Sequence, residues 1–175
     1  TFAAARTRPK VVETQVVAAC ARSPQLYLGW GIAPLLRSMI PCHIFVAVPV
    51  FSGALKDLWG RNMAAATLCT LDVYTDADID AFMDAHATPE QNEAFAALVP
   101  WAYKVDLWRA VALHTFGGIY IDADTELLKP PDVAINLNLD EVQIPRDRNP
   151  RCLFNGVVAS NKGNQHMKRV IDRIV

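Results

Sequence analysis

Two aspartates stand one residue apart at the end of an apolar run, in the segment IYIDAD. If this run is a β-strand, its period of two sends Tyr120, Asp122 and Asp124 to one face. Neighbouring carboxylates repel each other, so such a pair calls for a cation between them. Hard oxygen ligands suit Mg²⁺ or Mn²⁺, which keep positions for water or phosphate oxygens. The pattern favours a divalent-metal site, and the alternative is a solvated strand end followed by a turn.

A pair of opposite charges precedes these aspartates. Asp106 and Arg109 are three residues apart and therefore share one face of a helix. Beside a metal site, the acid could bind a ribose hydroxyl, and the guanidinium fork matches the oxygens of a phosphate. The alternative is a surface ion pair, which stabilises a helix by only about a few tenths of a kcal/mol.

The elements that position these residues alternate between strands and helices. The segment HIFVAVPVF (43–51) is rich in β-branched and aromatic residues and predicts a buried strand that ends near Pro49, and TLCTLDVY (67–74) predicts the next strand. A helix is predicted from about residue 100 to Phe116, and Gly117 ends it directly before the strand IYIDAD. The alternation predicts an α/β fold with a mostly parallel sheet flanked by helices, whose carboxyl edge is where such folds bind ligands.

Two further helix starts are marked by threonines. Thr75 is followed by acids that suit the first turn of a helix. Thr88 is followed by Pro89 and by Gln91, the pattern of a capping box. Two short consecutive helices are therefore predicted between the second strand and the helix of Asp106.

Composition sets the broad class. The chain has 175 residues, of which 52% are hydrophobic and 20% charged, with a net charge of −1. These values indicate one globular domain and disfavour a dedicated nucleic-acid partner. No apolar stretch is long enough for a transmembrane segment. The cysteines lack the short spacings of a zinc site, so we expect buried free thiols, or one disulfide if the chain is secretory; they are Cys20, Cys42, Cys69 and Cys152.

The segment KVDLWRAVALHTFGGIYIDADTELLKP, residues 104–130, resembles the D-x-D sugar-binding region of a glycosyltransferase group. This group contains the Och-type mannosyltransferases and the clostridial toxin glucosyltransferases. Its pattern is D-x-x-R on a helix, then G-G-[IV]-Y, then [LI]-D-x-D. Seven residues fall in register with it: Asp106, Arg109, Gly117, Gly118, Tyr120, Asp122 and Asp124.

Weaker similarity extends the resemblance over about residues 40–175. The segment LFNGVVASNKGNQHMKRVID is similar to a later part of the family pattern, N-x-x-x-A-S-x-x-x-H. In the opening strand, Phe45 and Val48 depart from the His and Trp of the family. We expect residues 40–175 to form the catalytic domain, truncated at its C-terminus because the family's last metal ligand has no match. Residues 1–39 are expected to be a helical packing segment, with a helix over residues 11–22.

The resemblance implies a GT-A fold, which is a Rossmann-like sheet that uses a nucleotide-sugar donor and Mn²⁺ or Mg²⁺. Asp106 and Arg109 would bind the sugar and diphosphate side of the donor, and Tyr120 would line its pocket. Asp122 would hold hydroxyls of the donor and assist the metal, while Asp124 would ligate the metal directly. Asp122 and Asp124 are therefore the expected catalytic residues.

The reaction that the resemblance implies is metal-dependent transfer of a hexose with retention of configuration. GDP-mannose is the first expected donor and a UDP-hexose the second, and the acceptor is a glycan, protein or lipid. Asn155 and His166 lie in the later matching segment and would face the acceptor. The expected location is the Golgi lumen for a eukaryotic chain with an anchor upstream, and the cytoplasm otherwise.

Two other interpretations stay open. IYIDADT also fits the first motif of haloacid-dehalogenase-like phosphatases, with Asp122 as nucleophile and Asp124 as general acid. Ser160 and Lys168 would then bind the phosphate, although that motif normally stands near the start of a domain and a later acidic pair is lacking. The second alternative is a non-catalytic binding protein with a glycosyltransferase-like fold, suggested by the unmatched metal ligand.

Overall fold

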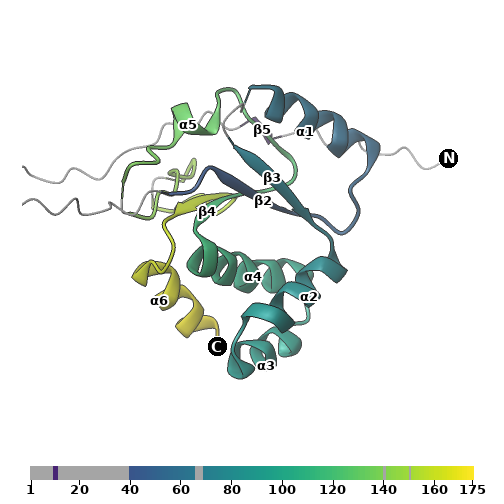
Figure 1. Ribbon diagram of the computed structural model, residues 1–175, viewed down its shortest axis with the longest axis vertical. Helices are drawn as coiled ribbons and strands as arrows, with labels where there is room; N and C mark the ends of the chain where they lie inside the picture. Colours follow the sequence, from purple (N-terminus) through teal and green to yellow (C-terminus); the bar gives the residue numbers. More distant parts are fainter. Residues whose placement is uncertain (1–9, 12–39, 66–68, 140, 150) are drawn as a thin grey trace, which may run out of the picture.

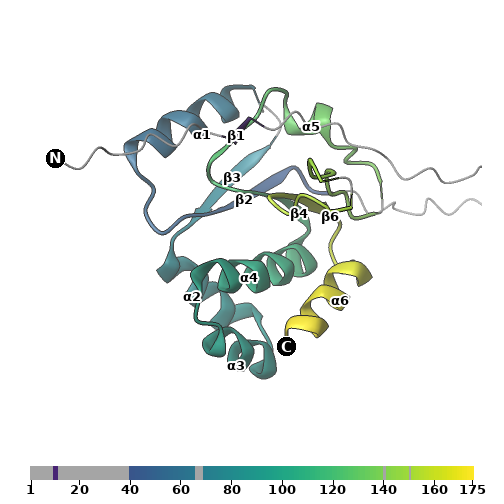
Figure 2. The same cartoon turned by 180° about the vertical axis from the view of Figure 1, so that it is seen from behind.

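The computed structural model describes residues 10–11, 40–65, 69–139, 141–149 and 151–175. In these residues a central sheet is covered by helices on both faces (Figures 1 and 2). The strand order is β3 (Thr70–Tyr74), β2 (His43–Ala47), β4 (Gly118–Ile121), β6 (Val157–Ser160). Strand β2 is parallel to β3 and β4, whereas β6 is antiparallel to β4. The predicted α/β fold with a mostly parallel sheet is confirmed.

The helices form two layers. One face of the sheet carries α1 (Gly53–Ala65) and α5 (Pro131–Ala134), which lie above it in Figure 1. The other face carries α2 (Asp76–His86), α3 (Pro89–Ala97), α4 (Trp101–Phe116) and α6 (Gln165–Ile174). Beside α1, a parallel pair forms between β1 (Lys10–Val11) and β5 (Thr125–Glu126). Val11 is therefore in a strand and does not begin a helix, and the rest of the helix predicted over 11–22 lies outside the described residues.

Alternation along the strands divides the core between the two faces. Phe45 and Tyr120 pack on the side of α4 with the buried indole of Trp108. Their neighbours in the strands, among them Ile44 and Ile119, pack on the side of α1. Strands β2, β4 and β6 are buried because helices cover both faces, as their apolar sequences predict, whereas β3 at the edge of the sheet is partly exposed.

The predicted helix ends are confirmed by their capping contacts. Thr75 and Asp78 form a complete capping box at the start of α2, and Thr88 and Gln91 form another at the start of α3. Gly117 ends α4 with a φ of 71°, and a Cβ there would lie 2.7 Å from the backbone nitrogen of Lys162. Helix α1 is not predicted by the sequence, in which Gly53 and Gly60 interrupt a weakly amphipathic segment.

A disulfide joins Cys42 and Cys69, which stand directly before the parallel strands β2 and β3. Their Cα atoms are 4.5 Å apart. The expectation of free thiols is therefore wrong for this pair, whereas Cys152 is free and exposed; Cys20 lies outside the described residues.

Replacing Cys42 with serine should lower the free energy of unfolding by about 3 kcal/mol. The bond joins residues with a sequence separation of 27 and so limits the conformations of the unfolded chain. Its loss raises the conformational entropy of the unfolded state, which lowers the stability of the fold. Urea unfolding of oxidised and reduced wild type and of C42S measures this effect. An unfolding midpoint in C42S equal to that of the oxidised wild type would contradict it.

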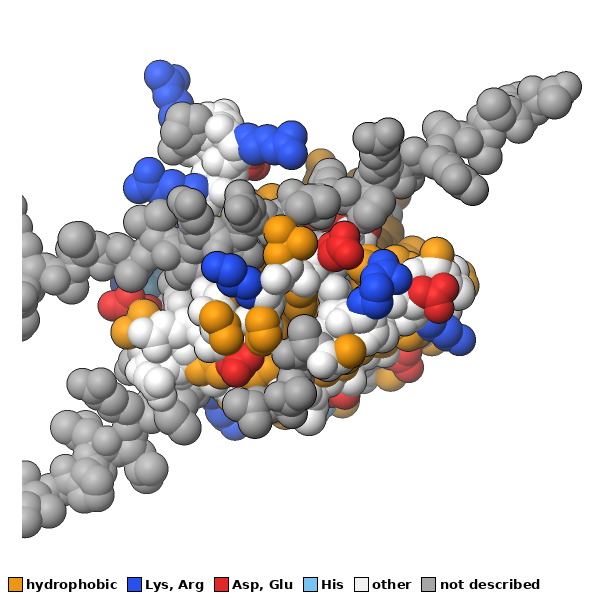
Figure 3. Space-filling model, turned by 90° about the horizontal axis from the view of Figure 1, so that it is seen from above, with side chains coloured by type: hydrophobic (Ala, Val, Ile, Leu, Met, Phe, Trp, Pro, Cys, Tyr) orange, Lys and Arg blue, Asp and Glu red, His pale blue; other side chains and the backbone are white. Residues whose placement is uncertain are grey.

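In the described part of the chain, no helix is long and apolar enough to cross a bilayer. Seen from above, basic, acidic and hydrophobic side chains are interspersed over the face of α1 and α5 (Figure 3). No single type of charge therefore marks a functional site on this face.

Candidate functional site

The two aspartates lie where the chain leaves the sheet. Strand β4 ends at Ile121, and Asp122 begins a turn in which the N–H of Thr125 donates to the Asp122 carbonyl at 3.0 Å. The alternation of a strand therefore does not continue to Asp124, and the prediction that both carboxylates share one strand face is wrong. Asp122 is half-buried and Asp124 is exposed, because the turn redirects the chain toward β5.

Asp122 is fixed by three contacts. Its N–H donates to the Gly156 carbonyl at 2.8 Å, and the hydroxyl of Tyr120 donates to its Oδ1 at 2.8 Å. Its Oδ2 faces Gly156 so closely that a Cβ on that glycine would lie 2.5 Å away. Gly156 is not among the residues predicted for the site, although a glycine directly before the apolar run VVAS is a signal of close approach.

Tyr120 remains a hydrogen-bond donor at neutral pH. Burial of its side chain, followed by the negative charge of Asp122, raises the pKa of Tyr120 well above its ordinary 10. The neutral hydroxyl can therefore hold the Asp122 carboxylate in one orientation over the physiological range.

Replacing Tyr120 with phenylalanine should lower the free energy of unfolding by about 1.5–3 kcal/mol, because a hydrogen bond to a charged group is lost while the ring still packs. A pKa raised in the folded state stabilises the fold below pH 10, and this contribution is lost as pH rises further. Wild type should consequently lose stability above pH 10 more steeply than Y120F. Urea unfolding at pH 7, 9 and 11 measures both effects, and parallel pH profiles would contradict the second.

Arg109 connects the helix α4 to this strand end. Its guanidinium donates to the Asp106 carboxylate and, at 2.9 Å, to the carbonyl of Asn155. The guanidinium carbon also lies 4.9 Å from the centre of the Tyr120 ring, within cation–π range. The ion pair predicted between Asp106 and Arg109 forms, with 11% of the Arg109 side chain and 39% of the Asp106 side chain exposed, so the guanidinium is mostly buried and its partner is partly open to solvent.

A cavity of about 230 Å³ opens beside this pair. Asp106, Arg109 and Asn155 provide its polar wall. The remaining wall is apolar and comes from α4, β6, α6 and the segment before β6; its residues are Ala110, Leu113, Ile144, Val158, Met167, Val170 and Ile174. The site thus combines an acidic turn, a charged pair and an adjoining apolar hollow.

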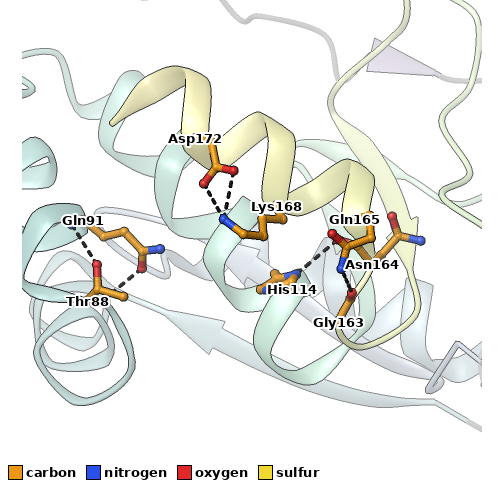
Figure 4. A network of polar contacts seen from close by, with 8 residues as sticks. All are labelled: Thr88, Gln91, His114, Gly163, Asn164, Gln165, Lys168 and Asp172. Carbon is orange, nitrogen blue, oxygen red and sulfur yellow. Dashed lines mark hydrogen bonds and ion pairs between the residues drawn. The ribbon is translucent and has the colours of Figure 1, made fainter.

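The two residues expected on the acceptor side are placed differently. Asn155 contacts Arg109 and directly precedes Gly156, so it lies at the site. His166 is exposed in the first turn of α6, where its N–H donates to Oδ1 of the helix cap Asn164 at 2.8 Å. The Asn164 carbonyl lies 3.1 Å from Nδ1 of His114 near the end of α4 (Figure 4). His166 is therefore not brought to the aspartate turn.

The residues that a phosphatase mechanism would need are not brought together in this fold. Ser160 pairs with Gly118 at the start of β4, whereas Asp122 follows its end. The Ser160 hydroxyl donates to the Asn161 carbonyl, and Lys168 pairs with Asp172 at 2.8 Å along α6 (Figure 4). Ser160 therefore lies at the opposite end of β4 from Asp122, and Lys168 lies on α6, paired with Asp172.

The aspartate turn fits a hard divalent cation that keeps several non-protein ligands. Asp124 offers an exposed carboxylate that makes no hydrogen bond or ion pair within the described residues, and Asp122 offers a second one at the same turn. Among these residues no group of three or more His, Cys, Asp or Glu side chains could hold a metal. Two carboxylates plus water and phosphate oxygens are the ligands that Mg²⁺ and Mn²⁺ commonly use beside nucleotides.

Comparisons with known proteins bear on the family and the fold. Residues 56–141 match the family described as "Glycosyltransferase sugar-binding region containing DXD motif". No curated protein matches the chain. A solved structure named PaToxG Glycosyltransferase superposes with a TM-score of 0.55 at 13% identity, covering 77% of this chain and 59% of its own. The chain therefore spans about three-fifths of the length of that protein.

The matched region and the similar fold together support a transferase of the D-x-D glycosyltransferase group. Residues 56–141 carry the sugar-binding region found in the D-x-D glycosyltransferases. The resemblance of residues 104–130 is confirmed, because the family match contains the Asp106–Arg109 pair, the double glycine and the D-x-D turn.

Proposed function

We propose that this chain transfers a hexose from a nucleotide sugar to an acceptor, using a divalent cation held by Asp122 and Asp124. One observation carries the proposal. The Asp106–Arg109 pair and the D-x-D turn are joined through Tyr120, which contacts Arg109 with its ring and Asp122 with its hydroxyl. Two motifs that bind different parts of a nucleotide sugar in the family pattern thus form one connected site.

Different residues of the site bind the cation and orient the donor. Asp124 reaches solvent and can ligate the cation, while Asp122, held by Tyr120 and Gly156, presents a fixed carboxylate beside it. Asp106 and Arg109 face the adjoining cavity, where an acid and a guanidinium can orient sugar hydroxyls and the diphosphate. When bound, Mn²⁺ or Mg²⁺ stabilises the negative charge that develops on the leaving nucleoside diphosphate.

The donor and acceptor follow from the family resemblance. GDP-mannose is the first donor and a UDP-hexose the second, and transfer retains the anomeric configuration. A glycan, protein or lipid acceptor would approach beside Asn155, whose carbonyl already binds Arg109 at the edge of the cavity.

A donor panel tests the proposal. The chain is incubated with GDP-mannose, UDP-glucose or UDP-galactose in Mn²⁺ or in EDTA, and released nucleoside diphosphate is measured. We expect release from one donor in Mn²⁺ and none in EDTA. Hydrolysis of p-nitrophenyl phosphate without turnover of any nucleotide sugar would support a phosphohydrolase instead. Binding of a donor without turnover, in the presence and absence of candidate acceptors, would support a non-catalytic binding protein.

The disulfide bears on the location of the chain. A bond between Cys42 and Cys69 persists in an oxidising compartment, and it therefore favours a lumenal or extracellular site of action, such as the Golgi lumen, over the cytoplasm. Alkylation of free thiols at harvest, followed by peptide mass spectrometry without reduction, tests this part of the proposal. A linked peptide pair supports it, and alkylated Cys42 and Cys69 contradict it.

A further inference from the structure

Two side chains of α1 hold the backbone of the D-x-D turn and of the segment after it. The indole Nε1 of Trp59 donates to the carbonyl of Ala123, the residue between the two aspartates, at 2.9 Å. The side-chain nitrogen of Asn62 donates to the Thr125 carbonyl at 2.9 Å, and its Oδ1 accepts from the N–H of Leu127 at 3.0 Å. Helix α1 lies beside β5 (Figure 1).

These contacts hold the backbone around Asp124, at the peptide group directly before it and at the Thr125–Glu126 peptide group one step beyond it. Trp59 holds the Ala123 carbonyl before it, and Asn62 holds the Thr125 carbonyl after it. The N–H of Thr125 is bound within the turn to the Asp122 carbonyl. The Asp124 side chain itself has no partner among the described residues, so its direction is set by the backbone that α1 holds.

Both side chains are buried, and their polar groups are directed at the turn and not at their own helix. Trp59 is 1% exposed and Asn62 is 2% exposed. An amide buried to this extent costs free energy unless it is bonded, and the backbone of Thr125 and Leu127 satisfies both ends of Asn62. A buried indole in this chain does not always find such a partner, since Nε1 of Trp108 has none in the described structure.

We propose that Trp59 and Asn62 are positioning residues for the cation: they hold Asp124 at the angle from which it ligates the metal of the donor complex. The inference rests on the proposed function, because the cation is the one that Asp122 and Asp124 hold for the nucleotide sugar. Residues that orient the ligands of a metal typically change its affinity by about 10–100-fold when they are replaced.

Trp59→Phe tests the proposal, because it removes the indole donor and keeps an aromatic ring. We expect the dissociation constant for Mn²⁺, measured from the electron paramagnetic resonance signal of the free ion, to rise about tenfold. The Mn²⁺ concentration for half-maximal turnover should rise by the same factor, and turnover should recover when Mn²⁺ is saturating. Trp101→Phe is the matched control, since Trp101 is half-buried at the start of α4. It should leave Mn²⁺ affinity unchanged.

The outcomes separate the positioning role from a structural one. If W59F loses stability but binds Mn²⁺ as wild type does, the two residues only support the fold and the inference is wrong. If wild type binds no Mn²⁺, the inference is also wrong. If wild type binds Mn²⁺ but turns over no nucleotide sugar, the proposed function fails, and the affinity of W59F still tests the inference.

Two further measurements serve if W59F does not fold. Asn62→Leu removes the hydrogen bonds to Thr125 and Leu127 and replaces the amide with a side chain of similar volume. Like W59F, it should raise the dissociation constant for Mn²⁺. In wild type, hydrogen exchange of the Trp59 indole N–H should slow when Mg²⁺ is added, because a bound cation stabilises the turn that this group holds. Unchanged affinity in N62L, or an exchange rate that does not respond to Mg²⁺, would overturn the inference.

Discussion

Asp124→Asn should reduce metal-dependent turnover of the nucleotide sugar by about a thousandfold. Asparagine keeps the shape of the side chain but removes the negative charge that binds the cation, and a lost metal contact corresponds to roughly 4 kcal/mol in the transition state. The fold should be unaffected within about 0.5 kcal/mol, because Asp124 is exposed and makes no polar contact with the described residues. Release of nucleoside diphosphate at fixed Mn²⁺ measures the loss.

Asp84→Asn is the matched control for this variant. Asp84 is an exposed aspartate on α2, so its replacement changes the net charge equally without touching the D-x-D turn. We expect wild-type turnover in D84N. If the turnover of D124N were within a few-fold of that of D84N, with the same dependence on Mn²⁺ concentration, Asp124 would not be a ligand of the metal.

Gly156→Ala should reduce turnover by about a hundredfold. A Cβ at this position would lie 2.5 Å from Oδ2 of Asp122 and 2.4 Å from the ring of Phe154, which are both closer than atoms can approach. The backbone cannot simply move away, because the Gly156 carbonyl accepts the N–H of Asp122 at 2.8 Å. A displacement of about 1 Å in a positioned group can cost about a hundredfold in rate, and the crowding should also lower stability by about 1–3 kcal/mol.

Gly60→Ala separates this crowding from the general effect of the substitution. Gly60 lies in α1 with no atom within 4 Å of an added Cβ, so alanine should raise stability by up to about 1 kcal/mol and leave turnover unchanged. Steady-state kinetics and thermal unfolding of both variants provide the comparison. If G156A showed the turnover of G60A, the close approach of Gly156 to Asp122 would have no role in the site.

The sequence predicts best those features whose causes are local. The capping boxes of α2 and α3 each lie within four residues, and Gly117 stands directly after the helix it ends. The order of strands and helices also follows from runs of apolar residues. The D-x-x-R and D-x-D motifs were found in the same way, because each is a short pattern with a chemical meaning of its own.

The missing parts of the site depend on contacts between distant segments. Trp59 reaches Ala123 across 64 positions, and Arg109 reaches Asn155 across 46. Periodicity along one segment cannot show that α1 lies against the turn, nor that Gly156 leaves room for Asp122. The predicted strand was also too long, since nothing in IYIDAD shows that the chain turns after Ile121 to pair with β1.

Calorimetric titration of the chain with GDP-mannose, UDP-glucose and UDP-galactose tests most directly whether the D-x-D turn holds a cation and a nucleotide sugar together. Each donor is titrated in Mn²⁺ and in EDTA, into wild type and D124N. The expected result is that one donor binds wild type in Mn²⁺ at least about tenfold more tightly than it does in EDTA or in D124N. Equal affinity in all three conditions, or no binding of any donor, would contradict the account.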